Sequence, residues 1–131
     1  MPQFNPPLRD QQFVLHELLD VEQVFKELPA HAEVGRDLID QVLEEGGKFA
    51  SEVVFPLNRD ADEEGCHYEG DGVVRTPKGF KQAYEKYVEA GWPTLTCTPE
   101  FGGQGMPQVV GMSMLENLNS ASQAWAMYPG L

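Results

Sequence analysis

The residues that could carry chemistry in this chain are few, and the first group is a glycine-rich loop. Gly102, Gly103, Gln104 and Gly105 stand just before a predicted helix that opens at Pro107. The backbone N–H groups of such a loop could bind a phosphate. The segment lacks the Gly-x-Gly-x-x-Gly spacing of dinucleotide-binding loops and the Lys-Ser/Thr of a P-loop. A structural turn that binds no anion is therefore the favoured interpretation, with φ > 0 at one or more of the three glycines.

Thiol and imidazole groups form the second set of candidates. Cys66 and His67 are neighbours, while His16, His31 and Cys97 are scattered along the chain. A zinc site needs roughly three or four ligands, so this spacing predicts no metal site. A nucleophilic Cys97 with a distant histidine has no more support. We expect Cys97 to be packed as a small apolar residue.

Carboxylates form the third set. Asp60, Asp62, Glu63 and Glu64 are close in sequence, but they lack the alternating oxygen ligands of an EF-hand loop. A solvated, charged helix end is the better interpretation than a pair of catalytic acids or a calcium loop.

Aromatic side chains near the end of the chain are a fourth, apolar group. Trp92, Trp125 and Tyr128 could line an apolar pocket, or they could simply belong to the core. Composition favours neither interpretation.

Charge and composition exclude several kinds of partner. The chain has 131 residues, 41% of them hydrophobic, and a formal net charge of −12. Such a chain repels nucleic acid, anionic membranes and the phosphates of a free nucleotide. It has no apolar run near the roughly 18 residues of a membrane span, and its polar N-terminus has no signal-peptide core. We expect a cytoplasmic protein without a nucleic-acid or membrane partner.

Apolar periodicity predicts the elements that position these residues. In the first of them, Asp10 is the expected N-cap and Phe13, Val14 and Leu18 are apolar positions. A restart is expected at Asp20, which has capping-box spacing to a glutamine three residues later. The expected helices cover about 10–28, 35–55, 77–90 and 107–120, with a token strand pair near 66–76.

Local signals set several element boundaries. Pro56 predicts a helix end near residue 55, and Gly91 is placed as a left-handed C-cap. Ser120 or Ser122 is expected to cap a last short helix that Pro129 breaks. Together these signals predict an all-α antiparallel helical bundle with at most a token β-hairpin.

Two stretches resemble the acyl-CoA dehydrogenase family. FASEVVFPLNRDADEEG at 49–65 is similar to that family's F-A-x-E-x-x-x-P stretch with its following D-x-x-G. GWPTLTCTPEFGGQG at 91–105, followed by a helix with Glu116, is similar to its P-E-x-G-G-x-G stretch. Residues 1–33 and 73–80 look like a long-form bacterial subgroup that includes methylmercaptopropionyl-CoA dehydrogenases.

The resemblance implies a three-domain flavoenzyme of fatty acid metabolism, of which this chain is only the first domain. Such oxidoreductases bind FAD, oxidise acyl-CoA to 2,3-enoyl-CoA, and pass electrons to electron-transfer flavoprotein; we also expect a homo-oligomer. Their middle β-domain and C-terminal helical domain, which carries the catalytic base, have no counterpart here. No catalytic residue is assigned, and the chain alone is expected to be inactive and to hold no FAD.

The resemblance also implies a substrate-facing segment. The turn after the Glu116 helix approaches the acyl cavity in this family, which makes Gln123, Ala124, Met127 and Tyr128 candidate wall residues. We accordingly expect Trp125 and Tyr128 on a rim of the domain.

The implied domain organisation is an N-terminal helical extension at 1–33 and the family's N-terminal helical domain at 34–131. The rival interpretation is a stand-alone helical interaction or oligomerisation module, which would either be a monomer with a polar surface or hide its apolar face in a closed symmetric dimer.

Overall fold

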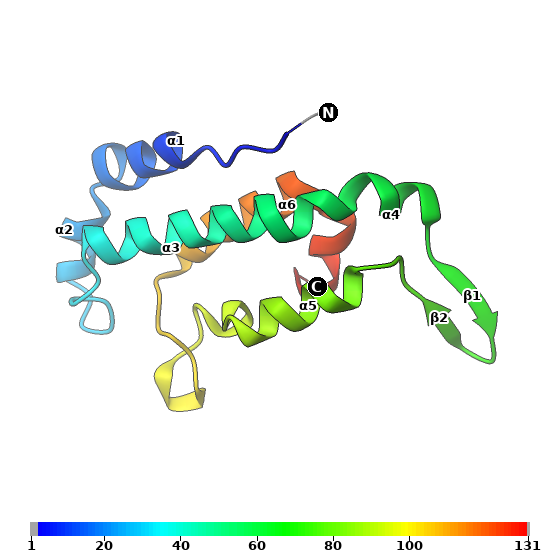
Figure 1. Cartoon of the computed structure of the whole chain (residues 1–131). Coiled ribbons are helices and arrows are strands. Elements are labelled where there is room, and N and C mark those ends of the chain that lie inside the picture. Colours follow the sequence, from blue (N-terminus) through cyan, green and yellow to red (C-terminus); the bar gives the residue numbers. More distant parts are fainter. Residues whose placement is uncertain (1–2, 131) are drawn as a thin grey trace.

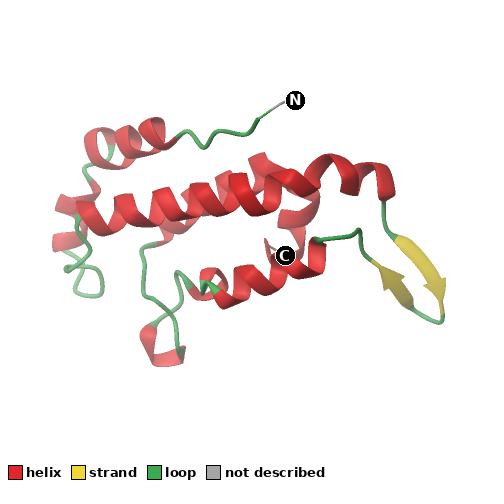
Figure 2. Cartoon of the chain, in the orientation of Figure 1, coloured by secondary structure: helices red, strands yellow, loops and turns green. Residues whose placement is uncertain are grey.

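The computed structural model describes residues 3–130 as a set of helices with one small β-hairpin (Figure 1). Met1, Pro2 and Leu131, which belong to the predicted regions 1–33 and 34–131, lie outside the described residues. Among the described residues, strands occur only in the hairpin that projects beside the helices (Figure 2), so the predicted all-α class with a token hairpin is confirmed. The elements are α1 (Leu8–Gln12), a π-helical turn (Phe13–Leu18), α2 (Val21–Lys26), α3 (Arg36–Phe49), a second π-helical turn (Ala50–Val54), a 3-10 turn (Phe55–Leu57), α4 (Asn58–Glu64), β1 (His67–Gly70), β2 (Val73–Arg75), α5 (Phe80–Glu89), 3-10 turns at Trp92–Thr94 and Pro99–Phe101, and α6 (Gln108–Gly130).

The core lies between the three longest helices. α3 and α6 pack against each other and run the same way, while α5 returns antiparallel to both (Figure 1). Ile39 and Leu43 of α3 and Val110 and Leu118 of α6 are buried there, as their three- and four-residue spacing predicts. Among the described residues, none of the helices is both long and apolar enough to cross a membrane.

Two consecutive glycines allow α3 to be approached closely on both sides. A Cβ on Gly46 would lie 2.8 Å from the sulfur of Met114 in α6. A Cβ on Gly47 would lie 2.9 Å from the ring of Pro6 in the N-terminal segment. The helix therefore accepts about 1 kcal/mol of unfavourable propensity per glycine relative to alanine in exchange for these contacts.

The helical path continues past Pro56, so the predicted helix end near residue 55 is wrong. A π-helical turn over Ala50–Val54 precedes the proline, which stands in the following 3-10 turn, and α4 resumes at Asn58. Proline has no N–H to donate and crowds the carbonyl four residues earlier. The hydrogen bonding changes here from α-helical to π-helical and then to 3-10, and this change accommodates the proline, which the interior of a regular α-helix excludes.

The N-terminal segment turns a different face inward from the one that periodicity predicts. Phe13 and Leu18 are 57% and 67% exposed, whereas Gln11, Leu15 and His16 are buried. The π-helical turn Phe13–Leu18 adds a residue to the turn and so rotates the buried face. The buried polar side chains have hydrogen-bond or ion-pair partners on other elements. These interactions stabilise the segment in this orientation, although several of its apolar side chains stay exposed.

Two predicted N-caps in the same segment are also wrong. α1 begins at Leu8, so Asp10 lies inside its first turn. Asp20 does precede α2, but it has a left-handed backbone (φ 46°) and no capping hydrogen bond from its side chain. The restart of the helix at this point is nevertheless where the sequence predicts it.

Of the two predicted boundaries of α5, the start is wrong and the end is confirmed. The helix begins at Phe80 after Gly79, whose φ of 85° turns the chain, and not at residue 77, where the sequence predicts its start. At the other end Gly91 has φ 78°, which confirms the predicted left-handed C-cap.

Candidate functional site

The C-terminal part of α6 carries the residues predicted to face a substrate, and a kink at Ser122 sets its direction. Ser122 has an extended backbone (φ −161°, ψ 98°) in the middle of the helix. Its hydroxyl oxygen accepts a hydrogen bond from the N–H of Trp125 at 3.4 Å, which is the geometry of an N-cap. Of the two predicted caps, Ser122 is therefore the one used. The predicted break at Pro129 is wrong, because α6 runs to Gly130.

Trp125 is part of the core, and the prediction that it lies on the rim is wrong. Its side chain is 1% exposed, and its Nε1–H donates to the carbonyl of Phe80 at 3.2 Å. The indole meets the ring of Tyr87 edge-on at 5.6 Å and that of Phe49 at 6.2 Å. A tryptophan is readily enclosed where its N–H reaches an acceptor, and the first residue of α5 supplies one.

Tyr128 lies at the surface as predicted, on a face shared with the other candidate wall residues. Gln123, Ala124, Met127 and Tyr128 are all exposed, and their spacing puts them on one side of the last helical turns. Met127 is 49% and Tyr128 51% exposed. The structure thus brings the four predicted residues together on one open face that the described residues leave uncovered.

A hollow of about 340 Å³ adjoins this face between α5 and the end of α6. The ring of Tyr128 forms one side of the hollow and meets Phe80 edge-on at 5.7 Å. An apolar, aromatic hollow with few polar groups is suited to an apolar ligand segment. Its lining residues are Thr76, Phe80, Lys81, Tyr84, Trp125 and Tyr128.

Tyr128 also contacts a thiol. Its hydroxyl lies 3.5 Å from the sulfur of Cys66. This hydrogen bond, followed by partial burial, raises the pKa of the Tyr128 phenol above its ordinary value. Burial likewise raises the pKa of the neighbouring Tyr87. Both phenols therefore stay protonated near neutral pH, where they can donate hydrogen bonds but cannot act as bases.

The glycine-rich loop is a closed structural turn. The N–H of Gly103 donates to Thr98, that of Gln104 to Thr94 and that of Gly105 to Cys97, at 2.9–3.0 Å. Gly102 and Gly105 have φ of 79° and 68°, which confirms the predicted left-handed glycines. Because its N–H groups are already used within the turn, the loop does not fit a flavin pyrophosphate.

Cys97 itself is exposed, so the prediction that it packs as a small apolar residue is wrong. Its carbonyl oxygen, however, is an acceptor inside the turn. The backbone at this position is thus the packed part, while the thiol points outward.

The other polar candidates are distributed over separate surfaces. Within residues 3–130, no group of three or more His, Cys, Asp or Glu side chains could hold a metal ion. Asp60, Asp62 and Glu63 are exposed on α4, as expected for a solvated helix end. His16, however, is buried between two carboxylates, and no sequence motif indicates that arrangement.

Comparison with known proteins gives consistent matches to one class of enzyme. No protein-family profile matches the chain. It is 36% identical to a 3-methylmercaptopropionyl-CoA dehydrogenase of Ruegeria pomeroyi over 96% of this chain and 21% of that protein. It is 32% identical to a butyryl-CoA dehydrogenase of Syntrophomonas wolfei, over 92% of this chain and 20% of that protein. A broad-specificity linear acyl-CoA dehydrogenase of Mycobacterium tuberculosis is 28% identical over 99% of this chain and 21% of its own length. The chain therefore spans about a fifth of the length of the curated relatives it matches.

Proposed function

Since this chain is homologous over nearly its whole length to the N-terminal fifth of acyl-CoA dehydrogenases, we propose that it forms the N-terminal helical domain of such an enzyme. The observation that carries the proposal is the alignment of 96% of the chain at 36% identity. In this proposal residues 1–33 are an N-terminal extension and residues 34–131 are the domain proper. The complete enzyme would use FAD to oxidise an acyl-CoA to the 2,3-enoyl-CoA, pass electrons to electron-transfer flavoprotein, and assemble as a homo-oligomer. A cytoplasmic location stays a prediction.

The proposed role of this domain is to wall one side of the acyl site. The open face of Gln123, Ala124, Met127 and Tyr128, with the aromatic hollow beside it, supports that role. An apolar wall excludes water and so strengthens the electrostatic interactions that act during proton abstraction. The general base and the groups that hold the flavin would come from the parts of the enzyme beyond this chain.

The charge of the chain also supports a role in which this domain contributes apolar surface and other domains bind FAD. The net charge of −12 opposes capture of the two phosphates of FAD. The turn at Gly102–Gly105 offers no free N–H groups for them. In this proposal FAD is bound by other domains, and the present residues contribute apolar surface next to it.

A domain exchange tests the proposal. The segment of the Ruegeria pomeroyi enzyme that aligns with this chain, 126 residues long, would be replaced by the present sequence. If the two are equivalent domains, the hybrid should fold, show the visible absorption of bound flavin and oxidise acyl-CoA with an artificial electron acceptor. A hybrid that folds and binds flavin but does not turn over any acyl-CoA would contradict the proposed function.

The acyl-wall assignment has its own test in the same hybrid. Met127→Ala should change KM for acyl-CoA in a chain-length-dependent way, because it removes apolar surface from the proposed wall. Met112→Ala is the matched control, since Met112 is also an exposed methionine of α6, at 59% exposure, but lies outside the candidate face. Equal effects of the two substitutions would remove Gln123, Ala124, Met127 and Tyr128 from the acyl site.

The alternative function is a stand-alone helical interaction or oligomerisation module. The exposed apolar side chains of Phe13, Leu18 and Leu19 in the N-terminal segment favour it. Such a module should form a closed dimer as an isolated chain, and substitution of Leu18 by Glu should dissociate it. Sedimentation of the isolated chain, read together with the activity of the hybrid, separates the two functions.

A further inference from the structure

An open groove lies between the N-terminal segment and the first turns of α6. Its volume is about 470 Å³, and it shares no lining residue with the hollow of about 340 Å³ beside the candidate acyl face. Apolar side chains line both of its sides: Val14 and Leu19 come from the N-terminal segment, and Val109 and Met112 come from α6. The groove has no part in the proposed function and is independent of it.

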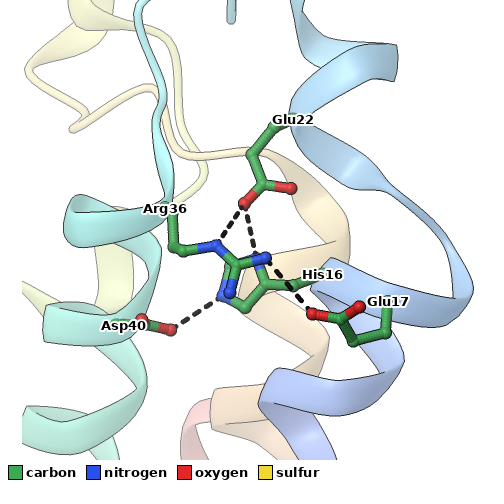
Figure 3. A network of polar contacts seen from close by, with 5 residues as sticks. All are labelled: His16, Glu17, Glu22, Arg36 and Asp40. Atoms are coloured by element: carbon green, nitrogen blue, oxygen red, sulfur yellow. Dashed lines mark hydrogen bonds and ion pairs between the residues drawn. The ribbon is translucent and has the colours of Figure 1, made fainter.

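The polar contacts of the N-terminal segment explain why it turns apolar side chains toward this groove. Nε2 of His16 is 2.8 Å from Oδ1 of Asp40 in α3. Arg36, also in α3, bonds Glu22 at 3.1 Å. Figure 3 shows these side chains gathered between the segment and α3. Because its polar side is held against α3, the segment presents apolar side chains on the side next to α6.

Three of these apolar side chains stay open along the groove. Val14 is 39% exposed, Leu19 47% and Met112 59%. Val109 and Met112 are three residues apart and so lie on one side of α6. A groove between two helical segments with exposed apolar side chains fits the apolar stripe of a third helix. The flexible thioether of Met112 can adapt to the shape of such a helix.

The carboxylates at the edges of the groove have no cationic partner. Asp10 lines it from α1 and Glu116 from α6, and among the described residues no Lys, Arg or His lines it. Within residues 3–130 neither carboxylate forms an ion pair, whereas Glu22 pairs with Arg36. The amide of Gln11 donates to Glu116 at 3.1 Å and so fixes this carboxylate at the edge. The groove therefore suits a ligand that brings its own positive charge.

We propose that this groove docks an amphipathic, basic helix of a partner protein. The apolar stripe of that helix contacts Val14, Leu19 and Met112. Lys or Arg side chains beside the stripe pair with Asp10 on one side of the groove and Glu116 on the other.

The net charge of the chain favours this occupant over others. At −12, the chain repels anionic membranes, nucleic acid and a second copy of itself. The same charge attracts a basic helix and raises its rate of association. Apolar contacts in the groove then fix where on the acidic surface the helix is held.

A model helix of leucine and lysine tests the docking on the full chain. The labelled peptide carries Leu at helical spacing and Lys at the other positions, and its counterpart carries Glu in place of Lys. Fluorescence anisotropy should show saturable binding of the lysine peptide and none of the glutamate peptide. Methyl NMR should show shifts centred on Val14, Leu19 and Met112. Shifts scattered over the acidic surface, or no binding of the lysine peptide, would contradict the proposal.

Leu19→Glu separates docking from attraction by net charge. The substitution removes an apolar contact but makes the chain more acidic. Docking therefore predicts about tenfold weaker binding of the lysine peptide, whereas net charge alone predicts tighter binding. The matched control is Leu28→Glu, which adds the same charge at a leucine that is 44% exposed and lies outside the groove. This control should bind at least as tightly as the natural chain, and equal affinities of the two variants would refute the proposal.

The two carboxylates have a test of their own. Asp10→Asn combined with Glu116→Gln should weaken binding of the lysine peptide about fivefold at low salt and less at high salt. Asp62→Asn combined with Glu89→Gln removes the same charge from exposed sites on α4 and α5 and should have a much smaller effect. Equal effects of the two pairs would overturn the assignment. So would sedimentation of the natural chain as a dimer that Leu19→Glu dissociates, because the groove would then belong to a second copy.

Discussion

The strictest constraint on a single residue is at Gly103, where two backbone segments of the glycine-rich turn approach each other closely. A Cβ added to Gly103 would overlap the carbonyl group of Cys97. That carbonyl also accepts the N–H of Gly105, so it cannot move away without opening the turn. The glycine is required here by space, whereas Gly102 and Gly105 are required by their positive φ.

Gly103→Ala should therefore destabilise the protein by about 3 kcal/mol, at the upper end of ordinary overpacking. The control is Gly35→Ala, because a Cβ on Gly35 has nothing within 4 Å and its φ is −99°. Urea denaturation of the two variants measures the difference. Similar midpoints would mean that the turn at 99–105 adjusts more easily than its contacts suggest.

Among the elements, the last turns of α6 depend on one side chain for their direction. Ser122 leaves the helical conformation and caps the turns that follow, which carry Trp125 into the core and Tyr128 to the surface.

The hairpin β1–β2 depends similarly on one side chain, Glu64. Its carboxylate accepts a hydrogen bond from the N–H of Lys78 at 2.9 Å and another from the guanidinium of Arg75 at 3.1 Å. The contacts of Ser122 and Glu64 are thus small in number, but they orient the last turns of α6 and the β-hairpin.

Ser122→Ala should lower the free energy of unfolding by about 1 kcal/mol, the usual effect of losing an N-cap acceptor. Ser120→Ala is the matched control, since Ser120 is exposed and lies just before the kink. Chemical denaturation followed by tryptophan fluorescence reports the change, because Trp125 is carried by the capped turns. Equal effects of the two substitutions would show that the kink persists without the cap.

Glu64 predicts a pH dependence at the base of the hairpin. The N–H of Lys78, and then Arg75, hold the pKa of the Glu64 carboxyl below its ordinary value. A lowered pKa in the folded state stabilises the protein above the unfolded pKa, and this contribution is lost as the pH falls through the folded pKa. Glu64→Gln should therefore lower the urea midpoint at pH 7 and have little effect once the pH is below that lowered pKa. The control Glu89→Gln replaces a carboxylate that is exposed on α5, and it should change little at either pH. A Glu64→Gln effect of the same size at both pH values would contradict the assignment.

At the scale of the whole molecule, acidity and open apolar surface occur together. The chain has 21 acidic against 9 basic residues, yet Tyr84 and Tyr128 are exposed around one hollow, and Met127 is exposed on the adjoining face of α6. A surface of this kind keeps the chain in solution by charge while leaving apolar area for a covering partner.

The isolated chain should accordingly be colourless and inactive. Among residues 3–130 it offers apolar surface, and the N–H groups of the turn at Gly102–Gly105 are bonded within the turn and so are not free for FAD. The measurement is the visible absorption of the purified chain, followed by an assay with acyl-CoA, added FAD and an artificial electron acceptor. A yellow preparation, or turnover above the rate without protein, would place a flavin site within these residues.

The sequence by itself determined those features whose causes lie within a few residues. The stripe of α3 and α6, the left-handed glycine at 91, at least one left-handed glycine among 102, 103 and 105, a cap at Ser120 or Ser122 and the short hairpin all follow from periodicity, φ preference or local hydrogen bonds. The exposed face that holds Met127 and Tyr128 could be predicted only because a family resemblance pointed to it, and the role of that face in acyl binding stays a prediction.

Tertiary structure decided the features whose partners are far away in the chain. Periodicity directs Phe13 and Leu18 inward, but the segment instead buries Gln11 and His16, whose partners lie on α6 and α3. Trp125 is enclosed because a carbonyl 45 positions earlier accepts its N–H. Burying a polar group is favourable only when a partner is in place, and which distant side chain or carbonyl arrives there is fixed by the packing of the helices, not by any local pattern.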